Sequence, residues 1–446
     1  MNAACVKQSL ITQIQDIAKH PELYCHDPGK DFTRKRKLPL PVLIPFILNL
    51  RGSSMTNEII DYFCCDSLSV SHSAIVQMRN KLKSDAFRTL LVEFNKRLEA
   101  IEPPETESGL RILAVDGTEI QTPTDPDDSD SYYPGANGQQ PYNMIHLNAL
   151  YDLLRRTYID AVIQKSRNQH ERKALIEMIE ASSVEKALVI ADRGYESYNI
   201  MAHIHEKGWF YLMRIKDGKN GIVSGLSLPD TDEFELDLTM NLTRSCTKQV
   251  KRLFEDRNHY RFVPCNVNFD YLPKLDGRYG TEPVFYSLTY RVVRIRISEE
   301  LTETLVTNLP QEQYPPKKLK ELYALRWGIE TSFRSLKYTV GMLHFHSKKA
   351  ECISQEVLAS LVVYNFTEWV TAQVVIQKSH CKHTYKVNFS AAVHICRAFL
   401  AGNMHPPDVE TLIAGYVVPI RPNRKFERRP SRKGKAAATS FTYRIA

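Results

Sequence analysis

Tyr323-Ala-Leu-Arg-Trp-Gly-Ile-Glu-Thr-Ser-Phe-Arg-Ser-Leu-Lys337 is the stretch around which the rest of the chain is organised. It contains one Gly and no Pro and follows a pair of prolines, which predicts a single long helix. On a helical wheel at about 100° per residue, one arc of roughly 60° holds Tyr323, Arg326, Glu330 and Lys337, with Arg334 at its edge. An adjoining apolar arc predicts that the helix packs against a sheet. The single carboxylate would then lie between core and solvent.

Two further carboxylates stand at the ends of apolar runs that have the composition of buried strands. Asp116 follows Arg111-Ile-Leu-Ala-Val, and Asp192 follows Ala187-Leu-Val-Ile-Ala. A charged stripe on a helix is often only a solvated network of salt bridges. Because Glu330 borders the apolar arc and two strand-ending acids precede it, we expect instead that the three carboxylates share a function.

The spacing of these residues resembles the signature of a known family. Tyr-x2-Arg-x3-Glu-x6-Lys, starting at Tyr323, looks like the signature of bacterial insertion-sequence transposases of the insertion-sequence-four family, which belong to the DDE class. Asp-Gly-Thr at 116–118 and Asp-Arg-Gly-Tyr at 192–195 resemble the first two motifs of that family. The resemblance spans residues 110–340 and implies a transposase with an RNase H-like catalytic core.

The chemistry of phosphodiester transfer explains why acidic residues are needed. Two divalent ions about 3.5–4 Å apart can activate the attacking oxygen, stabilise the leaving oxygen and neutralise the phosphate. Mg²⁺ prefers oxygen ligands. We therefore assign Asp116, Asp192 and Glu330 as the catalytic residues and as ligands of two Mg²⁺ ions, for which Mn²⁺ can substitute.

The remaining residues of the stripe would hold the DNA. Arg326 is expected to bind phosphate by a bidentate fork and Lys337 as a point charge, with Arg334 beside them. Tyr323 would hydrogen-bond a phosphate or stack on a base. A row of cations beside a carboxylate cluster suits a polyanion that lies across both.

The order of the apolar patterns predicts an α/β protein with several parts. Three strands at 111–116, 143–151 and 156–164 are followed by a helix at 169–181, a strand at 187–191, a helix at 197–207 and a strand at 209–215, the order of an RNase H-like core. Short alternating runs at 250–254, 260–267, 284–293 and 301–308 predict an antiparallel β insertion. The expected parts are a helical DNA-binding domain (1–100), the first part of the catalytic core (108–217), the β-rich insertion (218–315), the last part of the core (316–345), C-terminal helices that support dimerisation (346–420) and a basic tail (421–446).

The N-terminal part contains a candidate helix-turn-helix at about 56–83. Two short helices joined by a tight turn are predicted there, the second starting at a Ser cap. A plain helical bundle fits the same pattern, because the turn lacks its frequent Gly; the family resemblance, which implies an N-terminal DNA-binding domain, favours DNA. The residues that the second helix would present to DNA are Ser73, Gln77, Arg79, Asn80 and Lys83.

The net charge of +8 is concentrated at the C-terminus. Residues 421–446 contain nine Lys or Arg and one acid, and the remainder of the chain sums to zero. Such a tail is either a disordered solubilising end or an arm that grips phosphates. For an enzyme that acts on DNA we expect the arm, with Arg424, Arg428 and Arg429 among its DNA contacts.

Composition excludes several other classes. No apolar run reaches the roughly 18 residues of a membrane helix, the N-terminus lacks a signal-peptide pattern, and no nucleotide-binding glycine loop is present. We expect a cytoplasmic protein that binds double-stranded DNA as a homodimer, without a membrane or nucleotide partner. The predicted function is a transposase that binds terminal inverted repeats, cleaves the ends and joins the 3′-hydroxyls to target DNA. An RNase H-like nuclease without strand transfer and a repressor with an inactive core are the alternatives.

Overall fold

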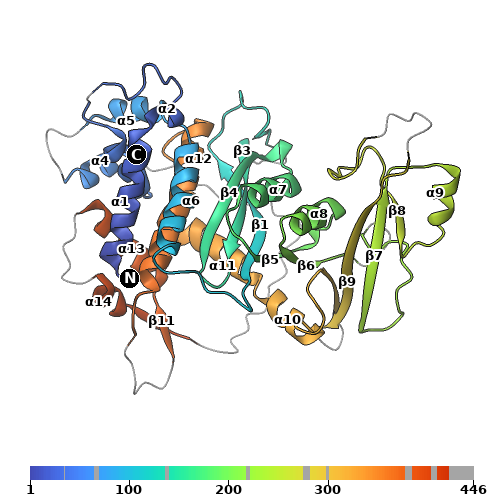
Figure 1. Ribbon diagram of the computed structural model, residues 1–446. Helices are drawn as coiled ribbons and strands as arrows, with labels where there is room; N and C mark the ends of the chain where they lie inside the picture. Colours follow the sequence, from blue (N-terminus) through green and yellow to red (C-terminus); the bar gives the residue numbers. More distant parts are fainter. Residues whose placement is uncertain are drawn as a thin grey trace.

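The computed structural model of the protein describes residues 1–34, 36–64, 70–135, 140–216, 221–274, 282–297, 301–376, 384–402 and 409–420. A ten-stranded sheet runs through the molecule, with a helical unit at one end and the inserted strands at the other (Figure 1). The fold is therefore mixed α/β, as the sequence predicts.

Five neighbouring strands form the central part of the sheet, in the order β4-β3-β1-β5-β6. β3 pairs antiparallel with β1 and β4, whereas β1, β5 and β6 are parallel. The strands are β1 (Arg111–Thr122), β3 (Tyr142–Asp152), β4 (Thr157–Lys165), β5 (Ala187–Ala191) and β6 (Phe210–Arg214); the two-residue β2 (Tyr132–Tyr133) pairs with β3. Each of the five central strands was predicted, although β1 continues six residues beyond the expected end at 116.

Helices cover both faces of this central sheet. On one face α7 (Glu171–Ala181) and α8 (Tyr198–Glu206) pack on alternate strand residues such as Leu113 and Val115. On the other face, residues such as Ala114 and Ile120 pack against the helical unit. β1 is buried on both sides because it lies at the centre of this three-layer arrangement.

The helical unit combines both ends of the chain. Helices from the N-terminal and C-terminal segments share one hydrophobic core, at the centre of which α12 is buried on nearly all sides. The helices are α1 (Ala3–Lys19), α2 (Pro21–Tyr24), α3 (Leu40–Asn49), α4 (Met55–Tyr62), α5 (His72–Arg79), α6 (Asp85–Glu99), α12 (Ala350–Thr371), α13 (Phe389–Ala401) and α14 (Val409–Ala414). The two-stranded sheet of β11 (Tyr385–Val387) and β12 (Val417–Pro419) lies at its edge.

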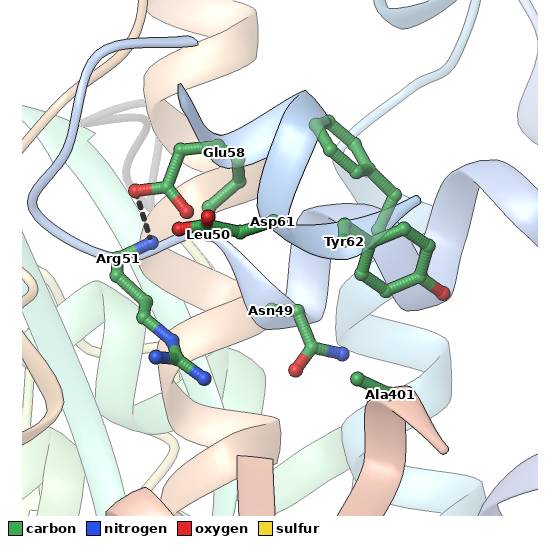
Figure 2. Close-up of a pocket in the computed structure, with 8 residues that line it drawn as sticks. Asn49, Leu50, Arg51, Glu58, Asp61, Tyr62 and Ala401 are labelled. Atoms are coloured by element: carbon green, nitrogen blue, oxygen red, sulfur yellow. Dashed lines mark hydrogen bonds between the residues drawn. The ribbon is translucent and has the colours of Figure 1, made fainter. Parts of the chain in front are cut away.

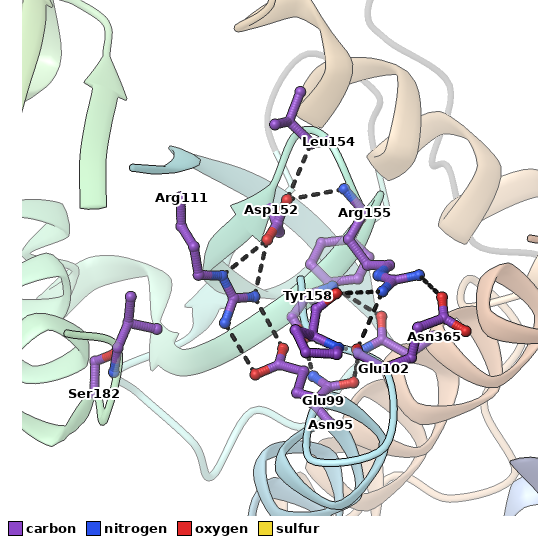
Figure 3. A network of polar contacts seen from close by, with 12 residues as sticks. Asn95, Glu99, Glu102, Arg111, Asp152, Leu154, Arg155, Tyr158, Ser182 and Asn365 are labelled. Carbon is purple, nitrogen blue, oxygen red and sulfur yellow. Dashed lines mark hydrogen bonds and ion pairs between the residues drawn. The ribbon is translucent and has the colours of Figure 1, made fainter. Parts of the chain in front are cut away.

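A buried ionic network ties the helical unit to the sheet (Figure 3). Arg111, the first residue of β1, pairs with Glu99 at the end of α6 (2.9 Å) and with Asp152 at the end of β3 (2.8 Å). Arg155 pairs with Glu102 at 2.6 Å. Because both Arg111 and Asp152 are buried, each needs the other to compensate its charge.

The insertion extends the central sheet instead of forming a separate one. Its last strand, β10 (Thr302–Thr307), pairs antiparallel with β6, and β9 (Tyr286–Arg296) and β7 (Phe234–Thr243) follow. Two expectations are corrected. Residues 250–254, expected as a strand, lie largely in helix α9 (Lys248–Leu253), which the Thr247 hydroxyl caps. The short β8 (Tyr260–Phe262) pairs parallel with β7, so the insertion is not wholly antiparallel.

The signature stretch is not one regular helix. α10 (Pro316–Ala324) and α11 (Trp327–Ser335) are joined by a tightened turn, because the amides of Leu325, Arg326, Gly328 and Ile329 each donate to the carbonyl three residues back. The helix then widens over Leu336–Val340 and ends at Gly341, whose φ of 93° suits glycine. The predicted apolar arc is buried, but Leu322 and Ile329 pack into different clusters. The tightening rotates α11 relative to α10, which a regular wheel does not anticipate.

No described helix has the length and apolar character that crossing a bilayer requires.

Candidate active site

Asp116 and Asp192 lie on neighbouring inner strands of the central sheet, just past the carboxyl end of the region in which β1 and β5 pair. β1 and β5 pair in parallel up to Ala114 and Ile190, so both carboxylates lie just beyond the paired region. Asp116 lies inside the twelve-residue β1, whereas the sequence predicted it at the end of the strand. Residues beyond the carboxyl ends of parallel strands converge on one crevice. The sheet therefore brings together two acids that are distant in sequence.

Asp192 is held by an arginine that the sequence did not single out. Arg214, the last residue of β6, donates from Nε and Nη2 to the two carboxylate oxygens at 2.7 and 3.0 Å. The Arg193 amide donates to the same carboxylate at 2.7 Å. Burial alone would raise the pKa of Asp192, but the amide and the guanidinium hold it below its usual value. Glu303 of β10 completes the cluster by pairing with Arg214 at 2.8 Å.

Glu330 reaches the same site from α11. Its carboxylate accepts a hydrogen bond from Arg326 Nη2 at 2.8 Å. Arg326 is only 4% exposed and interacts electrostatically with Asp116, Asp192 and Glu330 alike. The three predicted acids thus surround one buried guanidinium. In this structure Arg326 faces the carboxylates, and the expectation that it binds a DNA phosphate by a bidentate fork stays a prediction.

Asp116 is the acid whose charge is least compensated. Burial, with smaller contributions from Glu330 and Glu171, raises its pKa to about 6, although the Gly117 amide and Arg326 act to lower it. Glu171 therefore adds a fourth carboxylate to the site. It is the first residue of α7, and its Oε1 lies 3.1 Å from Nε2 of the buried His146 on β3.

Two glycines leave the space that Glu171 and His146 occupy. A Cβ at Gly117 would lie 2.2 Å from His146 Nε2 and 3.0 Å from Glu171 Oε1, and one at Gly194 would lie 3.2 Å from Glu171 Oε2. The glycines of the Asp-Gly-Thr and Asp-Arg-Gly motifs are thus explained by close approach of these side chains. The sequence gives no signal for Glu171 or His146, since neither is in a recognisable motif.

The remaining residues of the predicted stripe occupy different environments. Arg334 is exposed, and Lys337 is half-buried and donates to the Glu119 carbonyl at 2.8 Å. Burial lowers the pKa of Lys337. The Tyr323 ring is buried, and burial raises the pKa of its hydroxyl to about 12. The expectation that Tyr323 hydrogen-bonds a phosphate or stacks on a base stays a prediction. That hydroxyl has no hydrogen-bond partner within the described residues.

The N-terminal candidates are only partly available to DNA. Ser73 and Gln77 are exposed on α5, and Asn80 and Lys83 are half-buried. Arg79 is 1% exposed, because its guanidinium pairs with Glu356 of α12 at 2.8 Å. The expectation that Arg79 contacts DNA stays a prediction, but in this structure its guanidinium faces α12. Part of the turn between α4 and α5 and the tail residues Arg424, Arg428 and Arg429 lie outside the described residues.

The chemistry of the site fits a hard divalent cation, although its present arrangement does not form a cage. The donors are carboxylate oxygens, which Mg²⁺ prefers. Among the described residues, no three His, Cys, Asp or Glu side chains are grouped closely enough to hold an ion. Asp192 and Glu330 are each directed at an arginine instead. Joint coordination by the three acids would require Asp192 to release Arg214 and Glu330 to release Arg326.

Comparison with known sequences identifies the family. The family described as transposase DDE domain matches residues 107–366, which include all three carboxylates and Arg326. The chain belongs to the DDE transposase family. As the motifs indicated, it is similar to transposases of insertion sequences, and divalent-metal dependence is a property of this class.

Two relatives illustrate the similarity. The transposase InsG of insertion sequence element IS4 from Escherichia coli (strain K12) is 21% identical over 366 residues, covering 80% of this chain and 74% of the relative. The transposase of insertion sequence element IS231E from Bacillus thuringiensis subsp. finitimus is 23% identical over 304 residues. That alignment covers 60% of this chain and 58% of the relative.

Among solved structures, a piggyBac transposase in a synaptic complex with hairpin DNA aligns with 90% of this chain and 80% of its own. Its sequence identity is 9% and its TM-score is 0.43. This likeness is too low to establish a common fold.

Proposed function

We propose that this DDE transposase binds the terminal inverted repeats of its own insertion sequence, cleaves the DNA there and joins the 3′-hydroxyl ends to target DNA. The observation that carries the proposal is the grouping of Asp116, Asp192 and Glu330 around Arg326, within the segment that the family matches. The relatives are named as transposases of insertion sequence elements, which supports the same substrate class.

We propose further that the catalytic core is RNase H-like. The strand order β4-β3-β1-β5-β6, with three antiparallel strands followed by two parallel ones, supports this assignment. We propose the division of the chain into an N-terminal DNA-binding part (1–100), a core in two parts (108–217 and 316–345), a β-rich insertion (218–315), C-terminal helices (346–420) and a basic tail (421–446). We propose that a homodimer holds the two ends of the element.

The three acids would hold the divalent cations, two Mg²⁺ ions in our proposal. Bound cations would supply charge neutralisation at the phosphate and activation of the attacking oxygen. Arg214 and Arg326 position Asp192 and Glu330 and keep the acids from repelling one another. Lys337 and Arg334, on the outer side of the same helix, are placed to bind backbone phosphates.

In the joining step, the 3′-hydroxyl oxygen of the element would attack a target phosphorus. A new P–O bond forms, the bond to the target strand's O3′ breaks, and the departing oxygen takes up a proton. Because one phosphodiester replaces another, no external energy source is required. The residues named above need only align the reacting oxygens and stabilise the charge that develops.

The deciding experiment incubates the protein with a labelled inverted-repeat duplex, Mg²⁺ and a supercoiled plasmid. We expect a cut at the 3′ end of the repeat and a product in which the labelled strand is covalently joined to the plasmid. Cutting without any joined product would favour the nuclease alternative. Binding without cutting, in the presence of Mg²⁺ or Mn²⁺, would favour a repressor.

A further inference from the structure

A basic loop beside α5 is the strongest feature that the proposed function leaves unused. The sequence from His26 to Lys37 contains five Lys or Arg and two Asp. This loop, together with the ends of α1 and α5, surrounds a cavity of about 390 Å³. Lys30, Arg34, Arg36 and Lys81 are among the residues that line it. Its lining residues belong to the N-terminal segments of the helical unit, whereas the three acids lie on β1, after β5 and on α11; Figure 1 shows α5 apart from these elements.

The loop is fixed to the C-terminal end of α5. Cys25 and Leu82 form an antiparallel β-bridge, with the His26 amide donating to the Lys81 carbonyl at 3.0 Å and the Lys83 amide to the Tyr24 carbonyl at 2.8 Å. Within the loop, Asp31 accepts from the Asp27 amide at 3.1 Å. These bonds join two chain segments more than fifty residues apart, so the cavity and the exposed face of α5 keep a defined relative position.

The acids of the loop neutralise some of its cations but not the arginines. Lys30 pairs with Asp27 at 3.1 Å, and Lys81 pairs with Asp31 at 3.2 Å. Arg34 and Arg36 are exposed and line the cavity, and within the described ranges neither makes a hydrogen bond or ion pair. Two guanidinium groups are therefore available to an anionic ligand.

The chemistry of α5 indicates that the anion is a phosphate of the DNA backbone. The exposed side chains Ser73 and Gln77 are uncharged, and Arg79 is buried against Glu356. A helix that reads base edges needs cations nearby to contact the phosphates on either side, because phosphate contacts fix its register. Arginine forks match phosphate geometry. The apolar part of the cavity wall, which includes Phe32 and Met78, suits the deoxyribose between two phosphates.

We propose that Lys30, Arg34, Arg36 and Lys81 form a phosphate-binding groove for the sugar–phosphate backbone of duplex DNA, adjacent to the bases that α5 faces. This inference rests on the proposed function, since it assigns the groove to the same inverted-repeat duplex. Arg34 and Arg36 contribute two phosphate contacts, which carry affinity but no sequence preference.

The test measures DNA binding by the full chain in EDTA, at several salt concentrations, with an inverted-repeat duplex and a scrambled duplex. The double variant R34A/R36A should lower the steepness of log K against log salt by roughly two units for both duplexes. R34K/R36K should keep the wild-type slope. K96A/K186A, which removes two exposed lysines away from the cavity, should also keep it. Ethylation of the few phosphates that contact the groove should interfere with binding of the wild type and of both control variants. The same ethylations should no longer affect binding of R34A/R36A.

An unchanged slope and interference pattern in R34A/R36A would overturn the groove, provided that thermal melting shows the variant to be folded. Loss of binding to the repeat alone would also overturn it, because the arginines would then read bases. Both results leave the proposed function intact if wild type still cuts and joins the repeat with Mg²⁺. A wild-type chain that binds no duplex would overturn both proposals.

Discussion

At the scale of single residues, guanidinium groups compensate the charges of the acidic cluster. Arg326 donates a hydrogen bond to Glu330 and interacts electrostatically with Asp116 and Asp192, and Arg214 donates to Asp192 from two nitrogens. A buried arginine among carboxylates is stable only while its partners remain. Substitutions in this cluster should therefore be chosen to change charge while keeping hydrogen bonds. The following two predictions use that rule.

Glu330→Gln should abolish cleavage and preserve the fold. The Gln amide oxygen can still accept from Arg326, but it is a far weaker ligand for Mg²⁺. Strand cleavage of an inverted-repeat duplex should fall on the order of a thousandfold, while binding in EDTA persists. Glu321→Gln, on the exposed side of α10, is the matched control and should cut normally. Cleavage by Glu330→Gln at close to the wild-type rate would contradict the three-carboxylate assignment.

Asp116→Asn should stabilise the protein at neutral pH in EDTA. The folded state raises the pKa of Asp116 from 3.8 to about 6, so folding favours the protonated form. Below about pH 3, under the unfolded-state pKa of 3.8, both states are protonated and nothing is lost. Above pH 6 the charged form destabilises the fold by up to about 3 kcal/mol. The free energy of unfolding in urea should be higher for Asn than for wild type at pH 7, and the gap should close as the pH falls from about 6 to about 3. A gap that does not depend on pH would contradict the raised pKa.

Gly117→Ala should disturb the site by crowding. Its Cβ would lie 2.2 Å from His146 Nε2, so the imidazole or β1 must move, at a cost of about 1–3 kcal/mol. The control is Gly52→Ala, whose Cβ would come no closer than 3.5 Å to His344. Urea unfolding measures both, and the double variant G117A/H146A should recover most of the loss. No recovery would show that the glycine is required for another reason.

At the scale of elements, a buried ion pair contributes to holding α5 against α12. Arg79 donates to Glu356 at 2.8 Å and to the Cys352 carbonyl at 2.9 Å on α12. Burial would raise the pKa of Glu356, but Arg79 and His346 hold it at about 2.

A second contact in the helical unit fixes α4. Glu58 of α4 accepts a hydrogen bond from the Arg51 amide at 3.0 Å (Figure 2). Both residues line a cavity of about 40 Å³, which has room for little more than a water molecule. Helix α5 is thus bonded to α12, and helix α4 to the segment that precedes it.

Arg79→Ala should therefore act on stability, whereas Gln77→Ala should act on DNA binding. Removing Arg79 leaves the buried Glu356 short of a partner, which typically costs about 3–5 kcal/mol. Gln77 is exposed, so its removal should leave urea unfolding unchanged and weaken binding to the inverted repeat but not to a scrambled duplex. An Arg79→Ala variant with wild-type stability would show that this pair does not hold α5 in place.

At the scale of the whole molecule, DNA affinity and catalysis should reside in different places. The carboxylates lie at the edge of the central sheet, the groove beside α5 lies in the helical unit, and the strongest charge excess follows residue 420. Electrostatic attraction to DNA comes from released counterions and adds up over contacts. Each region can therefore be removed with a distinct effect on specificity, salt dependence or chemistry.

Deleting residues 421–446 should weaken binding to every duplex alike. The deletion removes nine Lys or Arg and one acid, so fewer counterions are released and the salt dependence flattens. The ratio of affinities for inverted-repeat and scrambled duplexes should stay the same. The measurement is a salt titration of binding in EDTA, with full-length protein as the control. A selective loss of inverted-repeat binding at unchanged salt slope would show that the tail recognises sequence.

The sequence by itself determined the elements and the acids. Strands such as Ala187–Ala191 and helix 389–401 follow from local apolar periodicity, and Asp116, Asp192 and Glu330 stand in motifs that are contiguous in the chain. The tertiary structure alone decided which charges meet. The burial of Arg326 and Arg79, the grip of Arg214 on Asp192, and the approach of Glu171 and His146 to Gly117 all depend on contacts between distant segments. Periodicity specifies which face of an element is apolar, but it carries no information about the partner packed against that face.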